Sequence, residues 1–342
     1  MSGVYADLAL RLPSTSAYWA GNGFRRELTT WVTDVVGEPR AMAPVRQRPW
    51  STVWRVETAA GVFFAKQNTP LQAFEAGLLS LLAALPPAHV VPVTAADPGR
   101  DLLLTPDQGP TLGDVLEPRL DAAGGEELLL ATVALVMRSA AELQRDLAGH
   151  VDELVQAGLT TLTSADAVPY VQRRLDELAT VPDADPRAFE PGAAAKLEAF
   201  LPALPAAVDE VGSLGLPVTL DHNDLHTYNV FEVGGHMRFF DFGDALLTEP
   251  LGALRGPLSG LAHHFECPID DPRLLATLEP ALEVWSDLVP LPELRAALPS
   301  AFRLARLGRC ESWLRCYASM TDAELGEYGD GAAYWLASVA DD

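Results

Sequence analysis

Lysine is almost absent from this chain of 342 residues, which contains only Lys66 and Lys196 alongside 22 arginines. Acidic residues outnumber basic ones, and the net charge is -23 at pH 7. Such a charge repels nucleic acid and anionic membranes, so we expect neither as a partner. It favours a cationic ligand such as an amine-bearing alcohol, although the same charge also suits a surface that only keeps the protein in solution.

Cysteine and long apolar runs are scarce as well. Cys267, Cys310 and Cys316 form no Cys-x-x-Cys pair and leave an odd residue over, which favours a reduced, cytoplasmic compartment. The longest uncharged apolar run, residues 128–137, is too short to span a bilayer. Residues 1–19 have neither the basic segment nor the apolar stretch of a secretion signal.

The most informative polar residues lie between positions 221 and 244. They form the pattern His-x-Asp-x-x-x-x-Asn, which runs from His222 through Asp224 to Asn229 and is followed by an apolar run and Asp-Phe-Gly from Asp241. This order is typical of phosphoryl-transfer kinases, which need a carboxylate to orient and deprotonate a hydroxyl and oxygen ligands to hold magnesium. Asp224 suits the first task, and Asn229 and Asp241 suit the second.

The local pattern predicts how these residues meet. We expect a strand over residues 216–220, a polar loop to residue 228, and strands over 229–233 and 237–240 joined by a Gly-Gly turn. The hairpin brings Asn229 beside Asp241, and Asp224 on the loop can face the same cleft.

Two other interpretations of this segment remain open. It could be a polar loop that only caps a hairpin. Alternatively, His222, Asp224 and His226 stand at alternate positions and could bind zinc or iron.

Lys66 interrupts an apolar strand predicted over residues 62–66, where a cation is costly unless it is paired. In a chain that otherwise uses arginine, this lysine indicates a compact charge for a phosphate group. A helix is expected over residues 71–85, and Glu75 is its only charged residue, so we expect Glu75 to pair with Lys66. The alternatives are a strand-edge lysine that reaches solvent and an ordinary surface glutamate.

With these residues the chain resembles the aminoglycoside phosphotransferase and choline kinase-like family, whose members are small-molecule relatives of the protein kinases. The resemblance runs from a helix near residues 24–36 to the last helices. It implies an α+β, two-lobed protein-kinase-like fold, with an antiparallel sheet in a small N-terminal lobe and a larger, mostly helical C-terminal lobe. We expect the lobes to be residues 1–107 and 108–342, with ATP bound between them.

The resemblance also implies roles for individual residues. Asp224 matches the catalytic base, and Asn229 and Asp241 match the magnesium ligands. Lys66 and Glu75 match the pair that holds the nucleotide phosphates. His222 is similar to the histidine that supports the catalytic loop from behind.

The nucleotide contacts of the N-terminal lobe are expected in two further segments. Residues 102–109 are similar to the family's hinge, which makes the Thr105 carbonyl and the Asp107 amide candidates for binding adenine. No Gly-x-Gly-x-x-Gly occurs over residues 46–56, so the loop over the phosphates is expected at residues 49–52, where Ser51 and Thr52 offer backbone N–H and hydroxyl groups.

The sequence therefore predicts an ATP- and magnesium-dependent O-phosphotransferase that acts on a hydroxyl of a small molecule, with a cationic, aminoglycoside-like antibiotic as one candidate acceptor. A kinase for an endogenous sugar, amino sugar, choline-like alcohol or amino-acid derivative is the alternative. A nucleotide-binding module without turnover is disfavoured because Lys66, Asp224, Asn229 and Asp241 are all present.

Overall fold

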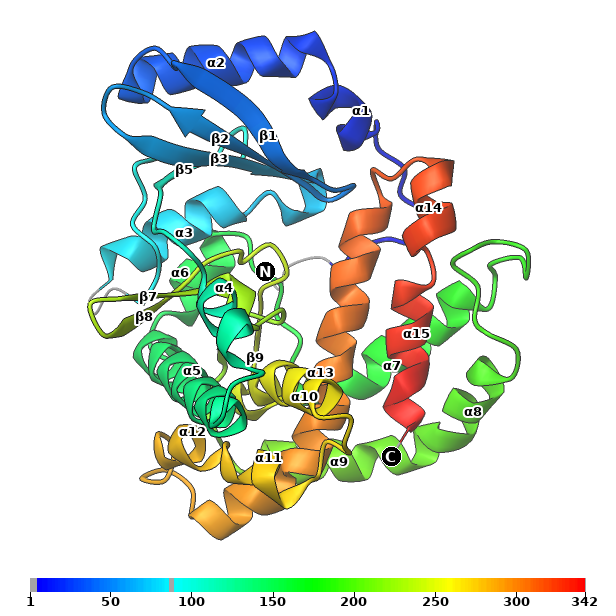
Figure 1. The fold of residues 1–342 in the computed structure, drawn as a ribbon. Helices are drawn as coiled ribbons and strands as arrows, with labels where there is room; N and C mark the ends of the chain where they lie inside the picture. Colours follow the sequence, from blue (N-terminus) through cyan, green and yellow to red (C-terminus); the bar gives the residue numbers. More distant parts are fainter. Residues whose placement is uncertain (1–4, 86–88, 342) are drawn as a thin grey trace.

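A five-stranded antiparallel sheet forms the smaller part of the molecule in this computed structural model, which describes residues 5–85 and 89–341 (Figure 1). Its strand order is β1-β2-β3-β5-β4. Helix α2 lies on one side of the sheet and α3 on the other (Figure 1). The elements of this part are α1 (Thr15–Trp19), α2 (Asn22–Val36), β1 (Ala41–Gln47), β2 (Ser51–Glu57), β3 (Val62–Asn68), α3 (Glu75–Ala84), β4 (Ala95–Asp97) and β5 (Leu102–Pro106).

The larger part is mostly helical and contains two short two-stranded sheets, β6 with β9 and β7 with β8. Together with the first part, this arrangement is the mixed, two-part α+β fold that the sequence predicts. Its elements are α4 (Leu112–Leu116), α5 (Gly125–Leu147), α6 (Val151–Gln156), α7 (Ala167–Leu178), α8 (Ala193–Phe200), α9 (Leu204–Ser213), β6 (Thr219–Asp221), β7 (Val230–Val233), β8 (His236–Phe239), β9 (Leu246–Thr248), α10 (Arg255–His264), α11 (Pro272–Ala276), α12 (Glu279–Glu283), α13 (Leu291–Tyr317), α14 (Asp322–Tyr328) and α15 (Gly331–Ala337).

The predicted hairpin is confirmed. β7 and β8 pair with Val230 opposite Phe239, and Gly234 and Gly235 form the turn with φ values of 62° and 80°. Two consecutive positive φ values are the geometry that favours glycine in a two-residue hairpin turn. The strand expected before the loop is shorter than predicted, because β6 begins only at Thr219, after Pro217, which has no N–H to donate.

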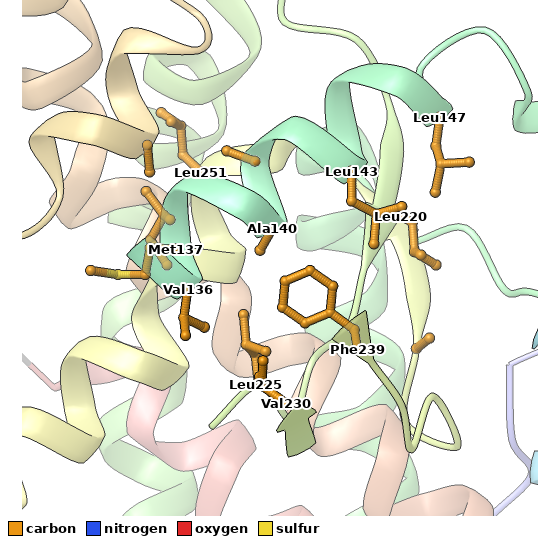
Figure 2. Packing of buried hydrophobic residues seen from close by; sticks show 14 of the residues in the cluster. Val136, Met137, Ala140, Leu143, Leu147, Leu220, Leu225, Val230, Phe239 and Leu251 are labelled. Atoms are coloured by element: carbon orange, nitrogen blue, oxygen red, sulfur yellow. The ribbon is translucent and has the colours of Figure 1, made fainter. Parts of the chain in front are cut away.

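Apolar residues of the motif hold the hairpin against the long helix α5. Figure 2 shows Val136, Met137, Ala140 and Leu143 of α5 gathered around Phe239 of β8. Leu225, Val230 and Leu220 belong to the same buried cluster. Since Leu225 follows Asp224 and Val230 follows Asn229, this packing fixes the backbone from which the polar residues project.

Helix α3 starts later than the sequence predicts. A 3-10 turn occupies Pro70–Gln72, and the α-helix begins at Glu75. The Gln72 side chain donates to Asp244 Oδ1 at 2.8 Å, which ties this turn to the catalytic segment. A tertiary contact therefore shapes residues whose apolar spacing suggests a longer helix.

The first described residues pack with the helical part rather than with the sheet. The Ala6 amide donates to Glu311 at 2.7 Å, and the Leu12 amide donates to the Ala318 carbonyl at 2.6 Å. The chain passes from the sheet to the helical part after β5, which ends at Pro106. The packing unit around the sheet therefore does not include the residues before α1.

An aromatic group joins the turn between β1 and β2 to the helical part. The Trp50 ring lies 5.6 Å from that of Trp313 on α13 and 5.2 Å from that of Tyr328 on α14, both edge to face. In the part of the chain that the structure describes, no helix combines the length and apolar character needed to cross a membrane.

Candidate active site

A cavity of about 320 Å³ lies between the sheet and the β7–β8 hairpin. Its upper wall comes from the sheet, one end from the segment after β5, and its floor from the hairpin. Phe231 and Phe240 on the floor stack at 4.7 Å. The other lining residues include Val45, Arg46, Val53, Phe64, Lys66, Glu75, Leu103, Thr105, Pro106, Gln108 and Asp241.

Lys66 sits at the inner end of this cavity between two carboxylates. Its Nζ lies 2.6 Å from Glu75 Oε2 and also contacts Asp241 Oδ1. The predicted pairing of Lys66 with Glu75 is therefore present. Burial alone lowers the pKa of Lys66, but the charges of Asp241 and Glu75 outweigh that effect and raise it above its ordinary value.

Glu75 connects the sheet to the Asp-Phe-Gly segment. Its Oε1 accepts the Phe242 amide at 2.9 Å, and its Oε2 accepts the Asn68 side chain at 2.7 Å. Because α3 starts at Glu75, this side chain leaves from the first turn of the helix and points back to β3. Glu75 can therefore reach Lys66 although the two residues are close together in the sequence.

Asp241 has an unusual backbone conformation, with φ at 66°. An aspartate in the left-handed region is uncommon and is held there by the packing around it. Burial acts to raise the pKa of Asp241, but the charge of the neighbouring Lys66 lowers it by more. The pKa therefore lies below its ordinary value, and the carboxylate stays charged.

The loop before the hairpin brings Asp224 and Asn229 together. The Asn229 side-chain amide donates to the Asp224 carbonyl at 3.0 Å, which leaves its Oδ1 available to a ligand. The Asn229 carbonyl accepts the Phe240 amide, so Asn229 lies next to the residue that precedes Asp241. His222 supports this arrangement, since its Nε2 lies 2.9 Å from the Phe240 carbonyl and its ring packs 4.6 Å from that of Phe242.

Asp224 is flanked by two basic side chains. Its Oδ1 lies 3.0 Å from Arg309 Nη1, and its Oδ2 lies 3.7 Å from His226 Nε2. Burial acts to raise its pKa, but the neighbouring His226 and the Arg309 charge bring it well below its ordinary value. The carboxylate is therefore charged at neutral pH and can accept a hydrogen bond from a hydroxyl.

The zinc or iron alternative finds no support in the geometry. His222 is directed to the Phe240 carbonyl, whereas His226 is exposed at the mouth of the site. Among residues 5–85 and 89–341, no three histidine, cysteine or carboxylate side chains gather as they would around a metal ion.

The structure corrects both expected adenine contacts, the Thr105 carbonyl and the Asp107 amide. The Asp107 amide is already used by the sheet, because it donates to the Val62 carbonyl at 3.0 Å. Backbone groups of alternate residues in an antiparallel strand point to opposite sides. Pro106 directly precedes Asp107, so its carbonyl points away from β3. Both Pro106 and Gln108 line the cavity. Thr105 also lines it, but Thr105 lies opposite Phe64 and has the same phase as Asp107, so its carbonyl is directed to β3 and not into the cavity.

Ser51 and Thr52 are not brought to the cavity. Both are buried at the start of β2, and the Thr52 hydroxyl accepts the Trp54 indole N–H at 3.1 Å. Side chains alternate along a strand, so Thr52 shares the α2 face with Trp54 while Val53 faces the cleft. Their expected contacts with phosphate would have to come from the backbone.

Arg309 and Asp244 are parts of the site that sequence reasoning missed. Arg309 donates to the Asn223 carbonyl at 2.8 Å and to Asp244 at 3.2 Å, which fixes the loop around Asp224. Asp244 directly follows Asp-Phe-Gly, so its position in the motif was an available signal. Arg309 lies on α13, far along the chain, and nothing in its sequence neighbourhood indicates the contact.

The chain also matches known proteins. Residues 45–251 match the sequence model of the group described as the phosphotransferase enzyme family. Among solved structures, it is similar to an ethanolamine kinase of Plasmodium vivax, with 12% identity, a TM-score of 0.58, and coverage of 94% of this chain and 89% of that one.

A second similar structure is a Ralstonia eutropha protein assigned by its description to the aminoglycoside phosphotransferases, with 11% identity, a TM-score of 0.53, and coverage of 92% of this chain and 98% of that one. Identities this low show a shared fold alone. No curated protein matches the chain. Since the family model spans more than half of the sequence, the resemblance expected from residues 221–244 is confirmed, and the chain belongs to the phosphotransferase enzyme family.

Proposed function

We propose that this phosphotransferase transfers the γ-phosphoryl group of ATP to a hydroxyl of a small molecule, with magnesium as its metal ion. The observation that carries the proposal is the contact of Lys66 with both Glu75 and Asp241 at the end of the cavity. The Asp224 loop is joined to this end through Asn229, which donates to the Asp224 carbonyl and accepts the Phe240 amide. These are the parts that phosphoryl transfer requires, because catalysis of this reaction is mostly positioning and charge stabilisation.

The cavity suits a nucleotide. Val53, Phe64 and Leu103 form an apolar wall opposite the stacked Phe231 and Phe240, which provides a slot for a flat base. The Pro106 carbonyl at the edge of this slot is our candidate acceptor for the amino group of adenine. The Lys66 ammonium at the inner end is placed to bind the nucleotide phosphates.

The polar groups near Asp241 suit magnesium. The free Oδ1 of Asn229 and the carboxylate of Asp241 are hard oxygen ligands, which magnesium prefers and zinc does not require. Magnesium, when bound, neutralises charge on the transferring phosphates. Asp241 would then exchange part of its contact with Lys66 for the metal, and Lys66 would turn to the nucleotide.

Asp224 would act on the acceptor. Its charged carboxylate orients the attacking hydroxyl by accepting its hydrogen bond, and takes its proton as the new phosphate ester forms. The low pKa makes Asp224 a weak base, which fits a loose transition state in which proton transfer is late. Arg309 holds the carboxylate in place and maintains its charge.

The class of acceptor and the location in the cell are also part of this proposal. A metabolite alcohol and an antibiotic are both compatible acceptors, and the relatives named above carry one description of each kind. Cys267, Cys310 and Cys316 are free thiols, which supports a reduced, cytoplasmic location.

An ATP-consumption screen with a panel of sugars, amino sugars, amino alcohols, hydroxy acids and aminoglycosides tests the function. We expect magnesium-dependent turnover that survives a zinc-selective chelator. Asp224→Asn should lower turnover by about two to four orders of magnitude, the usual contribution of general acid–base catalysis, with ATP binding retained. The exposed Asp152→Asn serves as the matched control. Unchanged phosphorylation by Asp224→Asn would sink the assignment, and ATP binding without any acceptor-dependent turnover would favour a binding module.

A further inference from the structure

A second cavity, of about 290 Å³, opens on the other side of Asp224 from the nucleotide cleft. The catalytic loop forms one wall, the start of α10 another, and α13 and α15 close the remaining sides. Besides Asp224, its most informative lining residues are Arg255, Arg309 and Trp335. A molecule whose hydroxyl is held at Asp224 would have room to extend into this cavity.

Two arginines contact the same indole ring in this cavity. The guanidinium carbon of Arg255 lies 5.0 Å from the Trp335 ring centroid, and that of Arg309 lies 5.9 Å from it. Contact with an aromatic ring stabilises a cation in part, although less than an ion pair or a hydrogen-bonded carboxylate. Trp335 thus holds both side chains in position without neutralising either.

The charges of the two arginines are balanced differently. Arg309 is neutralised by Asp224 at 3.0 Å and Asp244 at 3.2 Å. Arg255 has no carboxylate within ion-pair distance in the described part of the chain, and the nearby charges that act on it include those of Arg306 and Arg309. Burial and the Arg306 charge lower the pKa of Arg255 to about 10, as expected for a cation without a counter-ion.

Arg306 does not relieve this excess. Its guanidinium is directed to main-chain carbonyls near the end of the chain, including that of Asp341 at 3.2 Å. A half-buried cation beside two others is costly for the folded protein unless a ligand supplies the missing negative charge. Arg255 lines the same cavity as Asp224, the residue that would activate the acceptor.

Building on the proposed function, we propose that the acceptor carries an anionic oxygen group, a carboxylate or a phosphate, which Arg255 binds while Asp224 holds the hydroxyl. The net charge of -23 suggests a cationic acceptor when it is read from composition. The charge that matters to the acceptor is the local one, and Arg255 would repel an ammonium group placed beside Trp335.

Matched acceptors separate the two possibilities. We would compare 4-hydroxybutyrate, its uncharged amide and 4-aminobutanol, together with glycerol 3-phosphate and glycerol, as substrates of the full chain. The anionic member of each set should have the higher kcat/KM, by roughly ten- to a hundredfold, which is the usual effect of one charge-assisted contact. The two sets also distinguish a carboxylate from a phosphate as the preferred group.

Variants locate the effect at Arg255. Arg255→Gln should reduce the preference for the anionic acceptor to near unity, mainly through KM, whereas Arg255→Lys should keep most of it. Arg138→Gln is the control, because Arg138 is half-exposed on α5 and pairs with Glu142 at the surface. A preference for the ammonium acceptor that Arg255→Gln leaves unchanged would overturn the inference.

A second measurement does not require turnover. Phenylglyoxal labelling followed by mass spectrometry reports the reactivity of each arginine in the ADP-bound enzyme. Arg255 should react several-fold faster than the ion-paired Arg309, and millimolar inorganic phosphate should protect it, with Arg138 unaffected. Equal reactivity of Arg255 and Arg309 without protection would contradict the inference.

The outcomes also separate this inference from the proposed function. If a neutral or cationic alcohol is phosphorylated in an Asp224-dependent reaction that does not involve Arg255, the function stands and the anionic acceptor is wrong. If Asp224→Asn leaves every phosphorylation unchanged, the proposed function itself fails.

Discussion

At the scale of single residues, Lys66 is the group on which the proposed binding of a nucleotide depends. Its ammonium group is shared between Glu75 and Asp241 and is largely buried, with 12% of the side chain exposed. Under the proposed function, a bound nucleotide would take Lys66 partly away from Asp241, while Glu75 would keep it in place. Asp241 would hold the proposed magnesium ion in place of the lysine, which would make this exchange possible.

Lys66→Ala should weaken ATP binding or turnover by roughly ten- to a hundredfold, since a charge-assisted hydrogen bond contributes about 1.5 to 3 kcal/mol. The matched control is Lys196→Ala, because Lys196 is 59% exposed and pairs with Asp341 at the surface. Lys66→Arg should also be impaired, since a planar guanidinium cannot replace a compact charge beside Glu75. Steady-state kinetics that do not distinguish the two alanine variants would show that the nucleotide is held in another way.

At the scale of elements, one buried carboxylate ties the end of β3 to the start of α3. Asp101 Oδ2 accepts the Asn68 amide at 3.0 Å, and Oδ1 accepts the Ala76 amide at 3.1 Å. Burial and the charge of Glu75 raise the pKa of Asp101 to about 7. The element junction that positions Glu75 therefore contains a group that titrates near neutral pH.

The raised pKa predicts a pH-dependent stability. Between about pH 4 and pH 7 the folded protein keeps the proton on Asp101, whereas the unfolded chain has lost it. The contribution of this residue to the free energy of unfolding should therefore fall as pH rises through that window. In urea unfolding, the free energy of unfolding of the wild type should be lower at pH 7.5 than at pH 5. This decrease should be smaller in Asp101→Asn, whereas the exposed Asp152→Asn should behave as the wild type. A parallel change in all three proteins would exclude Asp101 as the cause.

At the scale of the whole molecule, the sequence predicts contacts between residues that are close along the chain but not contacts between distant segments. The glycine turn and apolar alternation predict the β7–β8 hairpin, and the isolated lysine predicts the pair with Glu75, because these depend on neighbouring residues. The prediction that the Thr52 hydroxyl faces the phosphates is wrong, because the alternation of side chains along β2 puts Thr52 on the face that α2 covers. Arg255 and Arg309 could not be found from sequence, since only the packing of α10 and α13 brings them to Asp224.

Trp50 joins the β1–β2 turn, where we expect the loop over the phosphates, to the C-terminal helices. Each of its edge-to-face contacts, with Trp313 and Tyr328, is expected to contribute about 0.5 to 1.5 kcal/mol. Trp50→Ala should therefore favour separation of the β1–β2 turn from the helices and speed ADP release by roughly five- to a hundredfold. Stopped-flow release of a fluorescent ADP measures this rate, and Trp50→Phe should give an intermediate value. Release from Trp50→Ala at the wild-type rate would show that the turn does not limit nucleotide exit.

The position of Trp313 on α13 has a thermodynamic consequence. The same helix carries Arg309, which contacts Asp224 beside the second cavity, so one element reaches both the β1–β2 turn and the loop proposed to hold the acceptor. Arg309 and Trp313 lie about one turn apart on α13, so an acceptor that steadies Arg309 should also steady Trp313 and thereby tighten nucleotide binding. Linkage makes such an effect reciprocal, so the nucleotide must increase the affinity of the acceptor by the same factor. The two substrates would then bind cooperatively in a single chain, with α13 as the element that couples them.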